Sequence, residues 1–431
     1  MNTNMVVTCS TCEQDIDCRI GYSNRTVQPL SFGCPVCGSL LEITLDISCA
    51  PQSGFSFKGC QPCEDRAQGS FGSGNPFVNL HLDFPVREGG YRMGETPYLM
   101  AFEEVEKNSE DHVVAQRKMH DFTMKLDILN EMHEKADEVR RLINLYSGKN
   151  KQLFQLRASQ FLEKPENKSL LPQDVNATLY LVIAKAFFPF TVFGQGKEIS
   201  SAMPRLMNGL DQDKLDEFVL SLEQSSFLPT LHRDCIKLYP RIFYAELPLR
   251  PALFLDMTRH AGTEKVATKI SSQDFLTLKD LYKDIIEVVN RQLVLVAGLN
   301  NLQHRGGADS FKAIDGGSLS SLRKFSEKTL SNKFKYLDDC WFNLSGEVFN
   351  LGLRNAIAHN NIDYDVSSQV ITYYPEGGRL EEPIARKMVF LDFMQLLLDS
   401  FREMHNLNHV MKSILYYKYL VYDRRYSSSG D

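Results

Sequence analysis

The chain has 431 residues, of which 43% are hydrophobic and 24% are charged, and its formal net charge is −6. This length suffices for two or three domains with at least one sizeable core, and the composition is ordinary for a soluble globular protein. The negative charge excludes nucleic-acid binding through a global positive field, so any such contact must come from local basic patches. No stretch approaches the ~20 apolar residues of a membrane span, and the N-terminus lacks a secretory-signal pattern. We therefore expect a cytoplasmic protein that has no membrane partner.

The cysteines are concentrated near the N-terminus, where eight of the ten lie within the first 63 residues. In a cytoplasmic chain, thiols arranged as CxxC pairs are more typical of metal binding than of disulfides. Only Cys235 and Cys340 occur later, and we expect both to be buried apolar side chains.

Two CxxC pairs, Cys9 with Cys12 and Cys34 with Cys37, are separated by a segment wide enough for a pair of strands. A knuckle turn brings residues i and i+3 under one ion, and four thiolates are a ligand set of structural zinc sites. The sequence therefore predicts one Zn²⁺ ion held by these four cysteines. Its role is expected to be structural, because four thiolates leave no coordination position for a substrate.

The second knuckle and the segment after it, GCPVCGSLLEITLDI, resemble the knuckle and strand of many zinc ribbons. A third pair, Cys60 and Cys63, leaves the ligand set open. These two cysteines either replace one of the first two pairs or join Cys18 and Cys49 around a second zinc ion.

Composition divides the chain into four regions. Residues 1–48 show turns, knuckles and short strands, with alternating apolar residues after the second knuckle. Residues 49–97 are dense in Gly, Ser and Pro and are expected to be an irregular linker that contains the third CxxC pair. Residues 98–265 form a helical middle region without a recognisable catalytic motif, and residues 266–431 form a final helical block.

In the middle region, residues 112–146 contain neither Pro nor Gly and carry apolar residues at helical spacing, which predicts a helix or a helix pair. A helix over 174–188 is expected to begin with Asp174 as its N-cap, and residues 211–224 have the pattern of a charged amphipathic helix. Residues 226–262 are richer in Pro and aromatic residues and are expected to be connectors that cover a core.

In the final block, residues 271–302 predict a long helix with a Ser-x-x-Asp capping pattern, and residues 318–330 and 338–359 predict two more. Residues 366–384 have the pattern of a β-hairpin with a Gly-Gly turn, and residues 385–404 predict a closing helix.

The most informative stretch is GLRNAIAHNNIDYD, residues 352–365, in which Arg354, Asn355 and His359 form the pattern R-N-x-x-x-H at the end of a predicted helix. Asn360 and Asn361 follow as expected C-caps. A histidine titrates near neutrality and can act as general base or acid, and an arginine matches phosphate oxygens with a permanent charge. These groups suit RNA cleavage by the internal 2′-hydroxyl, which requires no metal.

This pattern, its place late in a helical block and the hairpin after it resemble the HEPN superfamily of helical bundles, over roughly the last third of the chain. The resemblance implies a C-terminal HEPN-like bundle with a β-hairpin insertion. At ~100° per residue, Arg354 and His359 lie ~140° apart around one helix, whereas Asn355 and His359 share a face. The resemblance therefore implies a homodimer or higher oligomer in which two copies form a composite site.

We accordingly expect a mainly α fold with a small N-terminal zinc ribbon. The function implied is a metal-independent endoribonuclease of bacterial antiphage defence or of a toxin, with tRNA or mRNA as substrate and a phage protein or nucleic acid as trigger. His359 would be the base or acid, Arg354 the phosphate stabiliser and Asn355 the orienting residue. The alternative is a non-catalytic nucleic-acid- or protein-binding adaptor, in which the zinc ribbon does the binding and the bundle only dimerises. In a purely structural interpretation of the motif, Arg354 pairs with an acid such as Glu347 or Asp363, and His359 is a helix-end histidine stabilised by the C-terminal dipole.

A basic aromatic segment, residues 416–426, has two interpretations. It either stacks on single-stranded RNA or forms a terminal amphipathic helix docked by its tyrosines. Arg305, Lys312, Arg323 and Lys324 either line a phosphate path or are a solvated surface.

Overall fold

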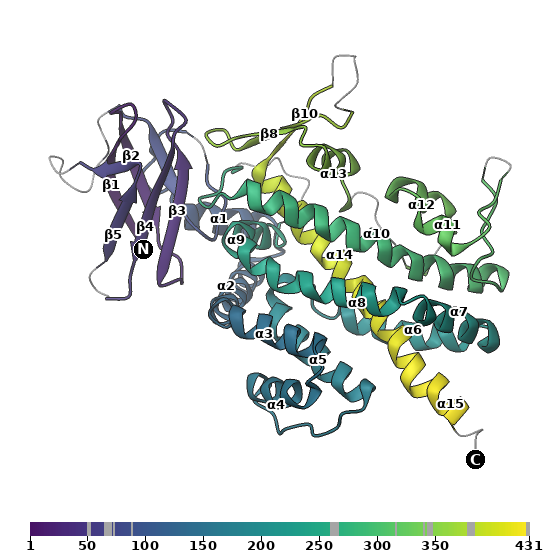
Figure 1. The fold of residues 1–431 in the computed structure, drawn as a ribbon. Helices are drawn as coiled ribbons and strands as arrows, with labels where there is room; N and C mark the ends of the chain where they lie inside the picture. Colours follow the sequence, from purple (N-terminus) through teal and green to yellow (C-terminus); the bar gives the residue numbers. More distant parts are fainter. Residues whose placement is uncertain are drawn as a thin grey trace. The chain divides into compact units, whose positions relative to one another are not determined.

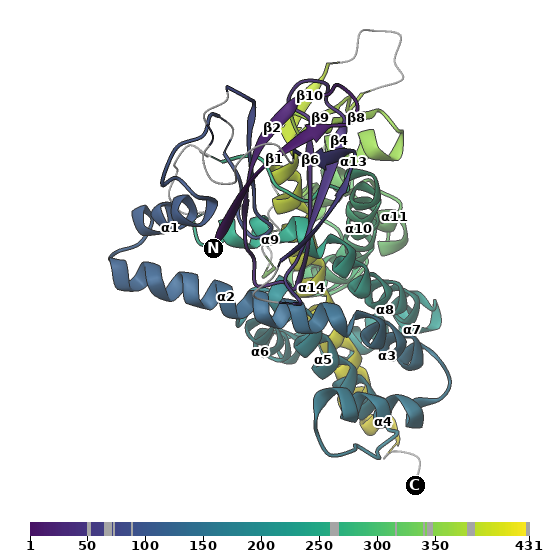
Figure 2. The same ribbon diagram turned by 90° about the vertical axis from the view of Figure 1, so that its left-hand side faces the viewer.

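The chain forms two compact units, each assembled from three segments. The first unit comprises Met1–His133, Phe243–Asp280 and Asn355–Leu398, and the second comprises Glu134–Ile242, Leu281–Arg354 and Asp399–Asp431. The computed structural model (Figures 1 and 2) describes residues 1–49, 53–63, 71, 74–87, 89–258, 267–314, 317–338, 341–342, 348–376 and 384–427. The fold is mainly helical with a small N-terminal strand region, which confirms the expected fold class at this level.

The N-terminal strands of the first unit form two sheets. β1 (Asn2–Cys9) and β2 (Asp15–Gly21) are an antiparallel hairpin at the centre of a four-stranded sheet, with β6 (Cys60–Pro62) beside β1 and β7 (Phe77–Leu80) beside β2. β3 (Val27–Gly33) and β4 (Leu40–Asp46) are a second hairpin in a three-stranded sheet, with β5 (Gly54–Lys58) on the other side of β4. In each hairpin the turn carries one of the CxxC pairs, so the predicted knuckles are the turns that connect paired strands.

The inner faces of these two sheets share one hydrophobic core. Burial alternates along β3 and β4, as expected when one face of a sheet is covered. Leu41, Ile43 and Leu45 are fully buried, which confirms the predicted strand after the second knuckle. The core consists of Val7, Cys9, Ile16, Cys18, Ile20, Leu30, Phe32, Cys34, Leu41, Ile43, Leu45, Cys60, Leu80 and Leu82.

The segment expected to be an irregular linker contributes strands to both sheets. β5 (Gly54–Lys58) pairs with β4, β6 (Cys60–Pro62) pairs with β1, and β7 (Phe77–Leu80) pairs in parallel with β2. The prediction of an irregular segment was therefore wrong over these residues, because edge strands this short show no persistent apolar period. The boundaries predicted at residues 48, 97 and 265 as limits of separate domains stay a prediction.

A buried arginine connects distant segments of the first unit. Arg250 lies on α9 (Glu246–Leu255) and is fully buried. Its guanidinium donates to Glu246 Oε1 at 2.5 Å and to Asp83 Oδ1 at 2.9 Å. It also donates to Ser23 Oγ at 3.2 Å and to Asn130 Oδ1 on α2 (His112–Glu134). One side chain thereby connects the N-terminal strand region, α2 and α9, which are far apart in sequence.

A second β element of the first unit confirms the predicted hairpin in part, since its first strand lies within 366–384 and its second strand follows that range, and it corrects the start of the closing helix. β9 (Val370–Tyr373) pairs antiparallel with β10 (Arg386–Val389) and with β8 (Ile362–Asp365). The expected Gly-Gly turn at 377–378 lies outside the described residues. The closing helix α14 (Phe390–Tyr417) begins five residues later than predicted and extends further, because residues 386–389 belong to the sheet.

The second unit is built from helices, several of them close to their predicted ranges. These are α3 (Ala136–Ser147), α4 (Lys151–Leu162), α5 (Pro172–Phe187), α6 (Gln195–Asn208), α7 (Gln212–Gln224), α8 (Phe227–Leu238), α11 (Leu322–Ser326) and α12 (Leu330–Tyr336). The long helices α10 (Phe275–Arg305) and α14 contribute most of their length to this unit, where Gln292 of α10 donates to the Met404 carbonyl of α14 at 3.2 Å.

The contact between α10 and α7 requires a glycine. At Gly298 on α10, a Cβ would lie 2.4 Å from the ring of Phe218, so only glycine permits the close approach of α7.

Further helix predictions differ from the structure, among them that over 318–330, where the helix α11 is only five residues long. Residues 226–262 were expected to be connectors, but their described part contains α8, a 3₁₀ segment and α9, and the prolines of α9 lie among buried apolar residues. The helix expected to begin at Asp174 begins at Pro172, which suits the first helical turn because its missing N–H would have no partner there. Within the expected helix 338–359, the described helical part is α13 (Leu351–Ala358).

The predicted helix or helix pair over 112–146 is a pair, α2 and α3. Its predicted apolar positions are all buried, namely Met119, Phe122, Leu126, Leu129, Val139, Leu142 and Ile143. In the part of the chain that the structure describes, no helix has the length and apolar character needed to cross a membrane.

Replacing Arg250 by Met is predicted to destabilise the protein by about 3–5 kcal/mol, because the buried Asp83 carboxylate would lose its arginine partner and the buried Glu246 carboxylate would keep Arg25 but lose Arg250. Urea unfolding followed by circular dichroism measures this change. Lys58→Met, which removes an exposed ion pair to Glu42, is the matched control and should leave the midpoint nearly unchanged.

The double variant Arg250→Met/Asp83→Leu should be less destabilised than the sum of its two single variants, because it removes a charge together with its partner. Strict additivity of the two substitutions would contradict the assigned interaction.

Candidate functional site

The two cysteine turns of the first unit have the same backbone pattern. In the first, Cys9 N donates to the Gln14 carbonyl at 2.9 Å, and Glu13 N donates to the Cys9 carbonyl at 2.9 Å. In the second, Cys34 N donates to the Ser39 carbonyl at 2.8 Å, and Gly38 N donates to the Cys34 carbonyl at 2.9 Å. The residue after each pair has a positive φ, 58° at Glu13 and 75° at Gly38. Each turn therefore curls its two thiols toward one point.

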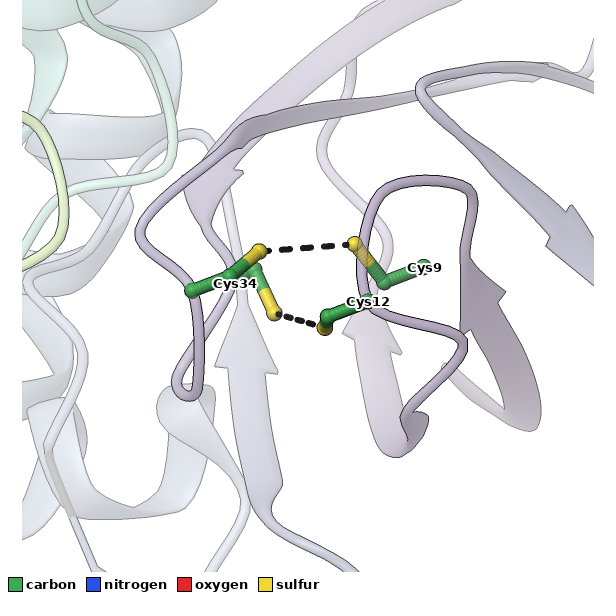
Figure 3. Close-up of side chains that lie close together, drawn as sticks. Cys9, Cys12 and Cys34 are labelled. Atoms are coloured by element: carbon green, nitrogen blue, oxygen red, sulfur yellow. Dashed lines mark hydrogen bonds between the residues drawn. The ribbon is translucent and has the colours of Figure 1, made fainter.

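The four thiols of the two turns converge. Figure 3 shows the side chains of Cys9, Cys12 and Cys34 directed toward one another from the two hairpin ends. The Sγ atoms of Cys9 and Cys37 lie 3.8 Å apart, those of Cys12 and Cys34 lie 3.7 Å apart, and all four are within 4.8 Å of one another. Tetrahedral coordination with metal–sulfur bonds of ~2.3 Å places ligand sulfurs about 3.8 Å apart. The spacing is compatible with one tetrahedral metal ion.

The protonation of the cluster is uneven. Hydrogen bonding with the Ser39 hydroxyl, whose oxygen lies 3.3 Å from Cys37 Sγ, lowers the pKa of the exposed Cys37 thiol to about 6. Burial raises the pKa of the Cys34 thiol. Thiols this close repel one another once ionised, so four thiolates are stable together only around a cation.

The other N-terminal cysteines do not form a second cluster among the described residues. Cys18 and Cys60 are buried in the core between the sheets, and burial raises the pKa of Cys18 well above its usual value and that of Cys60 to about 11. Cys49 is exposed. Cys235 is fully buried, as predicted, whereas Cys340 lies outside the described residues.

The Arg–His motif lies on and directly after α13. Arg354 and Asn355 belong to the helix, and His359 is the first residue after it, with its N–H bonded to the Asn355 carbonyl at 3.0 Å. Asn360 adopts a left-handed φ of 55°, and Asn361 N donates to the Ala356 carbonyl at 2.8 Å. These are the features of a Schellman C-cap, which confirms the predicted capping role of Asn360.

The side chains of the motif differ in their surroundings. His359 and Asn355 are exposed. Arg354 is about one third exposed and forms an ion pair with Glu287 of α10. Glu287 was not a candidate, because it lies 67 residues earlier in a helix that shows no motif of its own. Of the two acids expected as alternatives, Glu347 lies outside the described residues.

The basic aromatic segment 416–426 is docked through its own side chains within the second unit. Tyr417 is buried and its hydroxyl donates to Asp216 at 2.7 Å, and Arg425 forms an ion pair with the same carboxylate at 3.1 Å. These contacts support the interpretation as a docked terminal helix at these two residues.

We expect the purified protein to carry one divalent metal ion per chain, measured by atomic emission. Cys12→Ser and Cys34→Ser should each lose most of it, since serine is a poor ligand at a thiolate site. Cys49→Ser is the control and should retain the ion, because this thiol lies outside the cluster. Retention in Cys34→Ser together with loss in Cys60→Ser would contradict the ligand set.

No family model matches this chain, and no curated protein and no solved structure is significantly similar to it.

Proposed function

We propose that this protein is a metal-independent endoribonuclease of HEPN type that cleaves RNA at a composite site formed by two copies of the chain. The observation that supports this most directly is the exposure of Asn355 and His359 at the capped end of α13. A histidine at the surface can reach the phosphodiester of a large substrate, whereas a buried one cannot. The same exposure allows a second copy to approach.

In the proposed reaction, the His359 imidazole removes the proton of the ribose 2′-hydroxyl, whose oxygen then attacks the adjacent phosphorus. The bond from phosphorus to the 5′-oxygen breaks, and this oxygen receives a proton, which leaves a 2′,3′-cyclic phosphate and a 5′-hydroxyl. The Arg354 guanidinium stabilises the charge on the phosphate oxygens in the transition state. Asn355, which shares a helix face with His359, orients the imidazole or the phosphate.

The Arg354–Glu287 ion pair bears on the role of Arg354 in two ways. It holds the guanidinium in one orientation at a partly exposed position, which lowers the entropy lost when a phosphate binds. The Glu287 carboxylate also competes with a phosphate for the same donors. This competition favours the second candidate function, a non-catalytic adaptor in which the pair is only structural.

A groove of about 1050 Å³ in the second unit supplies basic side chains for RNA contacts. Its lining includes Lys214, Arg291, Arg305 and Arg323, with Glu217 and Asp309 as the acidic residues. Arg323 is 90% exposed, whereas Arg305 is held by Asp338 at 2.5 Å. We infer that RNA is bound by such local positive surfaces, since the net charge of the chain is negative.

We infer further that the ion of the four-cysteine cluster is zinc and that it stabilises the N-terminal sheets as a zinc ribbon. The proposed biological role is bacterial antiphage defence or toxicity in the cytoplasm, with tRNA or mRNA as substrate and a phage protein or nucleic acid as trigger.

His359→Ala should lower cleavage of total RNA in EDTA by about 10²–10⁴-fold, because the general base is lost. Cleavage is measured by gel electrophoresis, with detection of 2′,3′-cyclic phosphate ends. His304→Ala, which removes another exposed histidine at a helix C-terminus, is the control. Cleavage that survives His359→Ala would refute the assignment.

A mixture of inactive Arg354→Ala and His359→Ala proteins should recover about a quarter of the wild-type cleavage if each site takes Arg354 from one copy and His359 from the other. Half of the dimers would then be mixed, and each would hold one intact site. A mixture as inactive as its components would exclude this composite arrangement.

Glu287→Gln separates the two candidate functions, because it removes the competing charge and keeps the shape of the side chain. An enzyme should keep or increase its RNA cleavage, while an adaptor should show no cleavage in either form. Thermal unfolding of Glu287→Gln and Arg354→Ala, measured in parallel, reports the structural contribution of the pair.

A further inference from the structure

The second unit contains a smaller pocket whose lining differs from that of the groove. Its volume is about 300 Å³, at the lower limit of the usual range for small-molecule sites. It is formed by α3, α4, α7, α8 and the C-terminal end of α14 with the π-helical turn after it. The residues that line it are Tyr146, Ser147, Lys151, Glu223, Leu228, Pro229, His232, Arg233, Ile236, Leu415, Lys418 and Tyr419.

Two tyrosine–lysine pairs line this pocket. The Lys151 Nζ lies 4.7 Å from the centroid of the Tyr146 ring, and the Lys418 Nζ lies 5.5 Å from that of the Tyr419 ring. Each pair combines an aromatic face with an adjacent cation. A ligand that has both a planar ring and an anionic group can contact the two parts of such a pair together.

The charges of the lining point to a doubly negative group. Lys151, Arg233 and Lys418 are cations and Glu223 is the one carboxylate in the lining, so its net charge is +2. His232 adds no charge at neutral pH, because burial lowers its pKa to about 4. A phosphate monoester carries a charge of about −1.5 to −2 at pH 7, which matches this lining better than a carboxylate does.

The individual cations differ in how strongly they are already engaged. Arg233 is 53% exposed and its contact with Asp234 is long, at 3.7 Å, so its fork remains accessible to a phosphate. Lys418 is paired with Glu223 at 2.5 Å, and the second oxygen of that carboxylate is buried without a hydrogen-bond partner among the described residues. This oxygen is an available acceptor for a hydroxyl or N–H group of a ligand.

The backbone has an unusual conformation where it enters the pocket. Lys418–Tyr422 form a π-helical turn between α14 and the terminal helix α15 (Asp423–Ser427). Such turns are rare and frequently occur at functional sites, because the additional residue changes which side chains face a neighbouring surface. Here Lys418 and Tyr419, the first two residues of the turn, both line the pocket.

We propose that this pocket binds a small aromatic phosphate, with the phosphate held by Arg233, Lys418 and Lys151 and the ring placed against Tyr419. This site is separate from the Arg354–His359 motif and does not depend on the proposed ribonuclease activity. Its ligand would act on the protein as a bound effector or stabiliser.

The test is calorimetric titration of the full-length protein with phenyl phosphate, inorganic phosphate and phenol. Phenyl phosphate should bind about 5- to 100-fold more tightly than inorganic phosphate, because the ring adds a stacking contact. Arg233→Gln and Lys418→Gln should each weaken phenyl phosphate binding about tenfold or more, and Tyr419→Leu should remove most of the preference for the ring. Lys237→Gln is the matched control, since Lys237 is exposed one turn further along α8 and does not line the pocket.

Thermal unfolding shows whether Lys418→Gln folds. If it does not fold, Arg233→Gln still tests the proposal, because Arg233 is largely exposed and its replacement should not disturb the fold. Absence of heat at millimolar phenyl phosphate would overturn the proposal. Equal affinities for phenyl phosphate and inorganic phosphate, or equal losses in Arg233→Gln and Lys237→Gln, would also overturn it. None of these outcomes bears on RNA cleavage, which is assayed separately.

Discussion

The burial of the Arg250 guanidinium is the constraint on which the first unit depends. A fully buried charge is tolerated only when its donors are satisfied, and Arg250 finds Glu246 on its own helix together with Asp83, Ser23 and Asn130. The partners come from the N-terminal strand region and from α2, so the network is complete only when these segments have assembled. The Arg250 guanidinium therefore gains its buried partners only as the first unit folds.

The second arginine of interest, Arg354, has the same chemistry in a different environment. Its glutamate partner, Glu287, lies on another helix, but Arg354 remains about one third exposed, and Glu287 is more exposed still. An ion pair in contact with water contributes little to stability and exchanges partners readily. Burial thus distinguishes an arginine that holds a fold together from one whose ion pair stays in contact with water.

The cysteine cluster and the smaller pocket of the second unit differ in how far apart in sequence their residues lie. The cluster is local, because two hairpin turns with the same hydrogen bonds and the same positive-φ residue bring four thiols within 4.8 Å of one another. The pocket is not local, because its tyrosines and cations come from helices separated by up to about 270 residues of sequence, from Tyr146 to Tyr419. Both arrangements concentrate charge of one sign, and such a concentration is stable when an ion or ligand of the opposite sign is bound.

The sequence by itself determined the features that depend on neighbouring residues. Spacing and local backbone preferences account for the CxxC turns, for β4, for the apolar face of α2 and α3, and for the Asn360 cap. Only the tertiary structure decided which thiols converge, that β5, β6 and β7 complete the sheets, that the proline-rich segment after α8 is helical and buried, and that Arg354 meets Glu287. Short edge strands, buried prolines and ion pairs between distant helices are stabilised by partners far away in the chain. Local sequence patterns therefore cannot predict them.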